Sequence, residues 1–390
     1  MKNYKFQNAT KIIFGRGMEK CVGEEILPYG KKVLFHHYGD EFILNSKIYR
    51  TVQESMKNVN LEIFELTGVQ PNPVLSKVKE GIEICKKEKI DFILALGGGS
   101  VIDSAKAIGL GATYDGDVWD HYTKKHVIQT SLPVGVVLTI PATGSESSAG
   151  SVITNEKNHI KLLGSNGHSR PVFAIMNPEI TYTVPYFSMA VGGVDMMSHV
   201  MERYFTNETC VELTDRLCEA TLRTIIHNLP RTLKNPMDYA ARSEIVFAGN
   251  LAHNGLLDCG RVPDWACHFI SHILGGFTNL SHGATLSILT PHWMDYVYRS
   301  NIEKFAQFAV RVWNEEYNPS DKEETALAGI RCLRNFWKEL GVPMTLSEAG
   351  VELSEGQMKE IATIVTEDGP VGNLQKLYKE DVFKILKASA

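Results

Sequence analysis

The sequence predicts an α/β protein in two parts, in which a mostly parallel, doubly wound sheet precedes an all-helical region. Short apolar runs alternate with helix-like segments over the first half of the chain, which is typical of parallel sheets with helices on both faces. The segment 91–96 (DFILAL) is almost continuously apolar, as expected of a strand that is covered on both faces. From about residue 186 the apolar residues instead recur at helical spacing.

The expected elements follow in chain order. Strands are expected at 32–37, 60–66, 91–96, 134–140 and 172–176, with helices at 48–58 and 74–87. Helices of the second half are expected at 211–228, 240–257, 265–274, 302–313 and 323–340, and more follow after a linker at Gly341. The boundary is placed near Pro185, which gives an α/β domain over 1–185 and an all-helical domain over 186–390.

Composition excludes several classes of protein. The chain has 390 residues, 44% of them hydrophobic, and a formal net charge of -5 without a basic block that would indicate nucleic-acid binding. No signal-peptide core opens the sequence, and the longest apolar run, 134–140, is too short to span a bilayer. The seven scattered cysteines lack CxxC spacing and are expected to be reduced thiols. We therefore expect a cytoplasmic protein without membrane or nucleic-acid partners.

A glycine run follows the third expected strand. Gly97, Gly98 and Gly99 lead into a predicted helix that opens at Ser100, and Ser100 with Asp103 fits a capping box. Glycines let the backbone approach a diphosphate closely, and the free N–H groups of a helix N-terminus favour that anion. A tight turn without a ligand is the alternative, but the apolar strand before the run favours diphosphate binding.

Two further turns at strand ends carry polar side chains. Thr143 and Ser145 lie in the segment 141–146 (PATGSE), and Thr139 comes just before it; all three could hydrogen-bond a nucleotide. By itself, this segment is better explained as a polar loop. Asp40 follows the first expected strand, where an acidic residue can accept hydrogen bonds from ribose hydroxyls and repel a 2′-phosphate. A solvated turn explains the position of Asp40 equally well.

Acidic and histidine residues recur four apart on two predicted helices. Asp195 and His199 share a face among apolar neighbours, and His268 and His272 repeat the spacing, with His282 following. A buried aspartate is costly unless it is paired or binds a cation. An Asp–His hydrogen bond and satisfied core histidines would explain each pair separately. The two pairs together indicate a divalent metal, Fe(II) or Zn(II), near which a histidine that is not a ligand could relay protons.

The motifs together resemble those of the iron-containing (type III) alcohol dehydrogenases, in particular their butanol and aldehyde dehydrogenase branch. The segments that carry the resemblance are GGGSVIDSAK at 97–106, PATGSE at 141–146, GVDMMSHVMERYF at 193–205 and the histidine segment 264–283. The resemblance spans 11–346. It implies hydride transfer between NAD(P)(H) and a small primary alcohol or aldehyde, in a homodimer whose site lies between a dinucleotide-binding and a metal-binding domain.

The resemblance also implies roles for single residues. The implied metal ligands are Asp195, His199, His268 and His282. His272 is implied to stand beside substrate and nicotinamide, as a proton relay. The implied cofactor contacts are Gly97, Gly98, Gly99, Ser100, Asp103, Thr139, Thr143, Ser145 and Lys161. Without the resemblance, Lys161 would be interpreted as a solvated lysine.

One departure from the family pattern bears on the cofactor. NADP-using members often carry Tyr-Gly-Gly-Gly-Ser after the first strand, whereas 38–42 reads Tyr-Gly-Asp-Glu-Phe here. Phe42 replaces the serine that would hold the 2′-phosphate, and two carboxylates stand nearby, so we predict NAD over NADP. The alternatives are a polyol dehydrogenase or dehydroquinate synthase-like relative of the same superfamily, and a non-catalytic metal- or nucleotide-binding sensor.

Overall fold

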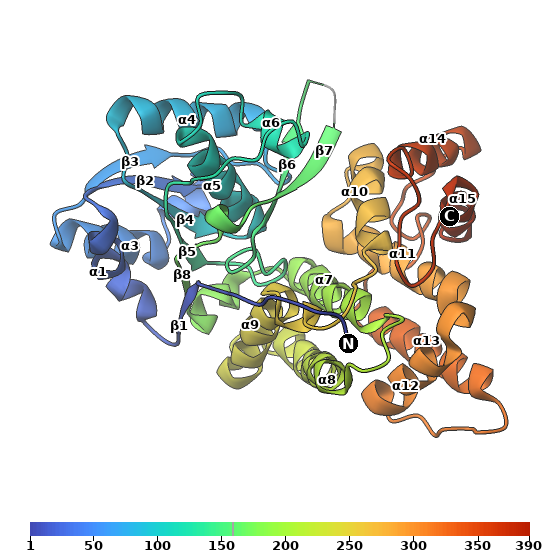
Figure 1. Ribbon diagram of the computed structural model, residues 1–390. Coiled ribbons are helices and arrows are strands. Elements are labelled where there is room, and N and C mark those ends of the chain that lie inside the picture. The colour runs from blue at the N-terminus through green and yellow to red at the C-terminus, as the bar shows by residue number, and fades with distance from the viewer. Residues whose placement is uncertain (158–159) are drawn as a thin grey trace. The chain divides into compact units, whose positions relative to one another are not determined.

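The computed structural model describes residues 1–157 and 160–390. The described chain divides into two units: the sheet unit is formed by residues 7–184, and the helical unit by residues 1–6 and 185–390. Strands and helices alternate in the first, whereas the second is built from helices (Figure 1). The predicted fold class is confirmed. Residues 1–6 group with the helical unit, although the predicted boundary assigned them to the first domain.

A six-stranded parallel sheet forms the centre of the sheet unit, with the order β1-β8-β5-β4-β2-β3. Its strands are β1 (Lys11–Phe14), β2 (Lys32–His37), β3 (Glu62–Leu66), β4 (Phe92–Gly97), β5 (Val134–Leu138) and β8 (Phe173–Met176). Strands β6 (Gly150–Asn155) and β7 (Ile160–Ser165) form a separate antiparallel pair. All five predicted strands are present, and β1 is an addition at the edge.

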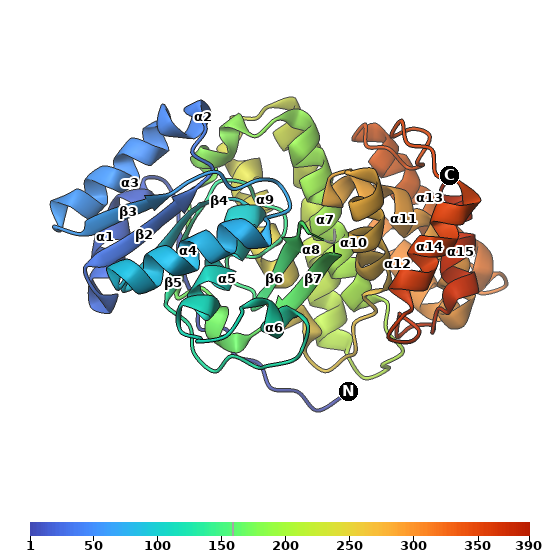
Figure 2. The same cartoon turned by 90° about the horizontal axis from the view of Figure 1, so that it is seen from above.

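Helices cover both faces of this sheet. The helices of the unit are α1 (Val22–Ile26), α2 (Glu41–Leu44), α3 (Lys47–Asn58), α4 (Leu75–Glu88), α5 (Gly99–Ala112) and α6 (Trp119–Tyr122). The short 3-10 helices are η1 (Met18–Cys21), η2 (Leu27–Tyr29), η3 (Gly167–Ser169) and η4 (Pro178–Thr183). Val33 and Phe35 share one face of β2 and pack in one apolar cluster with residues of α1 and α3. Helices α4 and α5 run side by side (Figure 2), and α5 also contacts β4.

The strand order places a topological switch point between β2 and β4. From β2 the chain adds β3 on one side, and from β4 it continues toward β5 and β8 on the other. His37, the last residue of β2, pairs with Leu96, the last residue but one of β4. The turn at 38–40 and the glycine run therefore start next to each other at the carboxyl edge of the sheet, where doubly wound folds bind their ligands.

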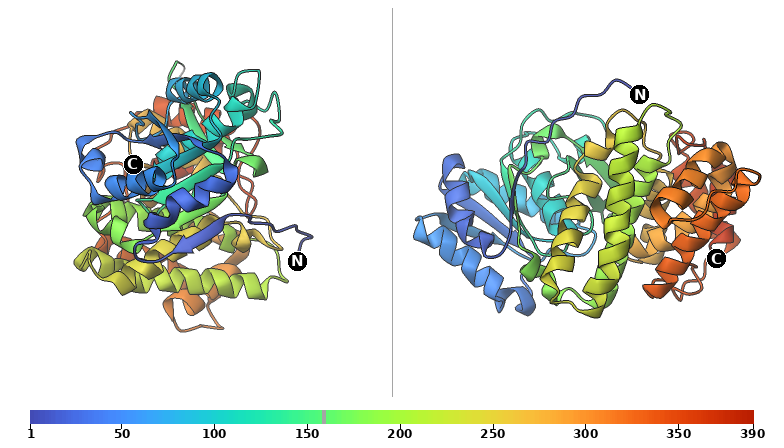
Figure 3. Two further views of the ribbon diagram at one scale, coloured as in Figure 1. Left: turned by 90° about the vertical axis from the view of Figure 1, so that its left-hand side faces the viewer. Right: turned by 90° about the horizontal axis from the view of Figure 1, so that it is seen from below.

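Over its described residues, the helical unit consists of nine α-helices. They are α7 (Tyr186–Tyr204), α8 (Glu212–Lys234), α9 (Tyr239–His253), α10 (Ala266–Thr278), α11 (His282–Val297), α12 (Ile302–Trp313), α13 (Lys322–Glu339), α14 (Glu355–Val365) and α15 (Lys379–Ala388), with short η5 (Leu256–Asp258) and η6 (Tyr298–Asn301). Helix α7 contacts α8, α9 and α11. The right panel of Figure 3 shows α8 beside α9 in yellow-green and yellow. Among the described residues, no helix has the length and hydropathy that a membrane span requires.

Candidate metal centre and nucleotide loop

Helix α7 carries polar side chains into the interior of the helical unit. Every residue from Met189 to Tyr204 is buried, so the helix is enclosed on all sides. Asp195, His199 and Glu202 follow at spacings of four and three residues and therefore share one face. Buried carboxylates on such a face are costly unless charged groups or a cation lie opposite them.

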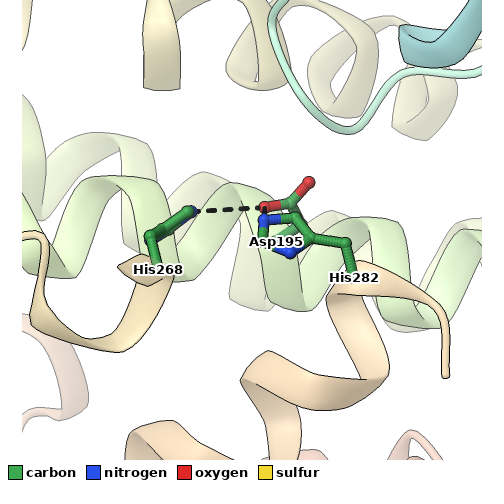
Figure 4. Close-up of side chains that lie close together, drawn as sticks. All are labelled: Asp195, His268 and His282. Atoms are coloured by element: carbon green, nitrogen blue, oxygen red, sulfur yellow. Dashed lines mark ion pairs between the residues drawn. The ribbon is translucent and has the colours of Figure 1, made fainter. Parts of the chain in front are cut away.

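Side chains from two other helices converge on Asp195. Its Oδ1 lies 3.7 Å from Nε2 of His268 on α10 and 3.7 Å from Nε2 of His282 on α11. Figure 4 shows both rings approaching the carboxylate from different helices. Ligand atoms of the three residues all lie within 4.8 Å of one another. Ligands about 2.1 Å from a tetrahedrally coordinated ion stand roughly 3.4 Å apart, so the three side chains are near enough to one another to share one ion.

The other two predicted histidines lie beside this group. Nδ1 of His199 is 3.4 Å from Oδ1 of Asp195, and its ring stacks on His268 with centroids 4.4 Å apart. The ring of His272 lies 5.0 Å from that of His282 and 6.4 Å from that of His268. The structure thus brings together all five residues that the sequence singled out. Which of them bind the metal stays a prediction.

The side chains present are suited to a divalent cation. Among the described residues, Nδ1 of His199 and Nε2 of His268 are buried polar atoms that make no hydrogen bond. Burial lowers the pKa of His199 well below its usual value, and His253 and His268 lower it further, so the ring is neutral and offers a lone pair. One carboxylate with several imidazoles is a donor set that Fe(II) and Zn(II) both accept.

Glu202 also reaches this site, although it was not predicted from the sequence. Its carboxylate accepts a hydrogen bond from the backbone N–H of Cys267 at 2.7 Å and contacts Nδ1 of His268. Burial lowers the pKa of His268, but the charges of Glu202 and Asp195 outweigh it and raise that pKa to about 9. The spacing of Glu202, seven residues after Asp195, was the signal that could have placed it on the ligand face.

In the sheet unit, the glycine run forms the turn from β4 into α5. Helix α5 begins at Gly99, and no side chain caps it at Gly98. A Cβ atom would come within 2.4 Å of Val101 at Gly97, and within 2.8 Å of Thr143 at Gly99. Close packing therefore requires glycine here, and the N-terminus without a capping side chain favours an anion such as a diphosphate.

The capping box predicted for Ser100 and Asp103 is wrong. The carboxylate of Asp103 instead accepts hydrogen bonds from Oγ of Ser145 at 2.5 Å and from the N–H of Val152 at 2.8 Å. Nζ of Lys106, which is fully buried, donates to the same Ser145 hydroxyl at 2.8 Å. These bonds connect α5 to the loop after β5 and to β6. Asp103 thus pairs with residues distant in the sequence and not with the start of its own helix.

Other predicted cofactor residues follow strand ends or lie on the β6–β7 pair. Asp40 caps the short helix α2 with its side chain. The backbone N–H of Thr139 donates to the carbonyl of Gly97 at 3.1 Å, which joins the loops after β5 and β4. Nζ of Lys161 donates to Oδ1 of Asn72 at 2.8 Å. Their contacts with a cofactor stay predictions.

The chain belongs to the iron-containing alcohol dehydrogenase family. Residues 9–178 match the family model for iron-containing alcohol dehydrogenase, and residues 189–390 match the model for the C-terminal part of the Fe-containing alcohol dehydrogenase family. The family predicted from the sequence motifs is confirmed. The protein is thus an oxidoreductase of a family that interconverts alcohols and aldehydes with a nicotinamide cofactor and a divalent metal.

Named relatives agree with this assignment. The chain is 43% identical over 389 residues to the probable NADH-dependent butanol dehydrogenase 1 of Bacillus subtilis (strain 168), with 100% of both chains covered. It is 35% identical over 361 residues to the NADPH-dependent aldehyde reductase YqhD of Escherichia coli (strain K12), covering 90% of each. The crystal structure of NADH-dependent butanol dehydrogenase A from Thermotoga maritima has a TM-score of 0.95 at 40% identity, covering 100% of this chain and 99% of that one.

Proposed function

We propose that this enzyme interconverts butanol-like primary alcohols and their aldehydes with NAD(H) and a bound Fe(II) or Zn(II). The observation that carries the proposal is the convergence of Asp195, His268 and His282 from three helices, in a chain of the iron-containing alcohol dehydrogenase family. Relatives named as NADH-dependent butanol dehydrogenases support the substrate class and the cofactor.

The ligands we propose are Asp195, His199, His268 and His282. A divalent ion held by them supplies a Lewis acid that polarises the substrate oxygen. His272, whose ring lies 5.0 Å from that of His282, carries the proton between that oxygen and water, since an imidazole titrates near neutral pH. The residues proposed for the metal fall within 186–390 and those for the nucleotide within 1–185, and we propose these as the two functional domains.

The cofactor is proposed to bind at the switch point of the sheet. Gly97 to Ser100 would hold the diphosphate at the start of α5, and the further contacts would come from Asp103, Thr139, Thr143, Ser145 and Lys161. Asp40 and Glu41 at the start of α2 disfavour a 2′-phosphate through charge repulsion. Comparison of kcat/KM for NADH and NADPH tests the preference, because an equal or higher value with NADPH would contradict it.

The activity itself is tested by following the reduced-nicotinamide absorbance with butyraldehyde or butanol. We expect turnover that a chelator abolishes and that added Fe(II) or Zn(II) restores. Glycerol belongs in the same substrate panel, because a polyol dehydrogenase would prefer it. Cofactor binding without turnover of any alcohol or aldehyde by the metal-loaded protein would refute the proposal.

We also propose a cytoplasmic homodimer. Among the described strands, β1 pairs with β8 alone and so presents an open edge, and its last residue, Phe14, is 36% exposed. An edge strand of this kind is satisfied when a second copy pairs with it. Light scattering is expected to give twice the chain mass of 43.5 kDa, and a monomeric mass would contradict the proposal.

A further inference from the structure

Glu202 is a buried residue whose carboxylate and backbone carbonyl both contact the start of α10. Its exposed fraction is 0%, and it stands on α7 seven residues after Asp195. Oε1 accepts the N–H of Cys267 at 2.7 Å, and Oε2 contacts Nδ1 of His268. The backbone carbonyl of Glu202 also accepts the N–H of Asp264 at 2.7 Å. One residue of α7 thus holds three positions at the start of α10.

The start of α10 has two acidic partners: Oδ1 of Asp264 accepts the N–H of Ala266 at 3.0 Å, and Glu202 accepts the next N–H, that of Cys267. The N-cap residue of α10, Trp265, has a left-handed backbone (φ 65°) and provides no capping side chain. The N–H groups of a first helical turn are open donors, and a negative charge beside them is stabilising. The carboxylate of Glu202, which comes from another helix, supplies a hydrogen-bond acceptor and a negative charge beside these N–H groups. It thereby fixes the position of His268 relative to α7.

The contact also decides which ring nitrogen of His268 can bind a metal. In a neutral imidazole one nitrogen carries the proton and the other offers a lone pair. Because Nδ1 faces the carboxylate of Glu202, it keeps its proton when the ring is neutral, as metal binding requires, and the lone pair then lies on Nε2. Nε2 lies 3.7 Å from Oδ1 of Asp195 and is buried without a hydrogen bond among the described residues. The ring therefore directs its lone pair into the candidate metal site.

His282 has a different partner. Its Nδ1 lies 2.9 Å from Oγ of Ser271, which is a neutral hydroxyl. A carboxylate partner orients a ligating imidazole and makes it more basic, and a hydroxyl does so less strongly. The two rings that flank Asp195 are thus unequal, with the charged partner on His268.

We infer that Glu202 is a positioning residue that holds His268 in the tautomer and orientation required for metal binding. The inference rests on the proposed metal site. Glu202→Gln keeps the size of the side chain and removes its charge. Its matched control is Glu219→Gln, because Glu219 is also a buried glutamate of the helical unit (3% exposed) but bonds to Tyr204 and Arg216.

The test measures Zn(II) affinity of the full-length protein by competition with a chromophoric chelator, after the resident metal has been removed. For Glu202→Gln we expect the Kd to rise roughly 10- to 100-fold, with Ser271→Ala showing a smaller rise and Glu219→Gln a value near that of wild type. The visible spectrum of the Co(II)-substituted protein is expected to change in Glu202→Gln and not in Glu219→Gln. A purely structural role would lower the unfolding temperature without moving either readout.

Two outcomes separate this inference from the proposed function. If His268→Ala loses Zn(II) affinity while Glu202→Gln matches wild type, the role of Glu202 is overturned and the metal site stands. If His268→Ala itself binds as wild type does, the proposed ligand set fails. Should Glu202→Gln not fold, Glu202→Asp replaces it: the shorter side chain is expected to weaken Zn(II) binding, and unchanged affinity would overturn the inference.

Discussion

Nζ of Lys106 lies 2.8 Å from Oγ of Ser145, in the interior of the sheet unit. Asp103 accepts a hydrogen bond from the same hydroxyl, so a lysine and an aspartate are joined through one serine. Burial lowers the pKa of Lys106 to about 8, although the charges of Asp103 and Glu146 oppose the shift. The hydrogen-bond network that connects α5 to the loop after β5 therefore contains a lysine whose pKa, about 8, lies within the pH range of ordinary unfolding experiments.

This lysine predicts how stability depends on pH. The pKa of Lys106 is about 8 in the folded protein and 10.5 as its ordinary value, so between these pH values the unfolded chain binds more protons. The contribution of Lys106 to the free energy of unfolding therefore rises with pH across that window, by up to roughly 3 kcal/mol. Denaturant unfolding of wild type and Lys106→Met at neutral and alkaline pH measures the difference. A difference in the free energy of unfolding between wild type and Lys106→Met that stays constant with pH would contradict the prediction.

A second prediction separates the ligand histidines from the proposed relay. His268→Ala removes a donor to the metal, so metal content and turnover should fall together. His272→Ala should retain the metal and lose most of its turnover, because the proton then lacks a carrier. Elemental analysis and the absorbance assay on the same samples measure both quantities. Full metal occupancy in His268→Ala, or metal loss in His272→Ala, would reverse these assignments.

A third prediction concerns the glycine turn. At Gly97 an added Cβ would lie 2.4 Å from the side chain of Val101, so Gly97→Ala forces the first turn of α5 away from β4. We expect a loss of about 1–3 kcal/mol of stability and weaker NADH binding. Gly167→Ala is the control in the same unit, since a Cβ there would meet nothing within 4 Å. Denaturant unfolding and NADH fluorescence titration provide the readouts, and equal behaviour of both variants would exclude the packing argument.

A fourth prediction addresses cofactor choice. Asp40 caps α2 through its side chain, so removing the residue outright would also disturb the helix. Asp40→Ser keeps a capping oxygen and removes the charge. We expect the ratio of kcat/KM for NADPH to that for NADH to rise about tenfold, since one charge repulsion of about 1.4 kcal/mol corresponds to that factor. A ratio that does not change would place the 2′-position of the cofactor away from Asp40.

The central strands could be predicted from the sequence because their burial does not depend on a particular partner. Strands β2, β4, β5 and β8 are buried along nearly their whole length, and each was placed close to its observed position. Strand β3 was also predicted, as one of the short apolar runs, although Glu62 and Glu65 in it are exposed. Strand β1 (KIIF) and strand β7 were missed. Both have mostly partly exposed residues, so their own residues carry little pattern, and pairing with β8 and β6 decides their structure.

Helices with internal proline or glycine were harder to predict. The helix expected to end at 228 continues through Pro230 to Lys234, and α11 was missed although it contains His282. Local rules treat Pro230, Pro291 and Gly283 as breaks, whereas packing in the helical unit overrides them. Similarly, four-residue spacing placed the histidines on helix faces. It did not show that the carboxylate of Glu202 contacts Nδ1 of His268.

The enclosure of α7 links the chemistry of the enzyme to its survival. Asp195 and Glu202 belong to the part of α7 from Met189 to Tyr204, in which every residue is buried. The ion would bridge α7 to α10 and α11. A ligand that binds only the folded chain stabilises it by about 2.7 kcal/mol at a concentration 100 times its Kd. Metal scarcity would therefore shorten the protein's lifetime against proteases as well as slow its turnover. The amount of enzyme in a cell would then follow the supply of the metal that it uses.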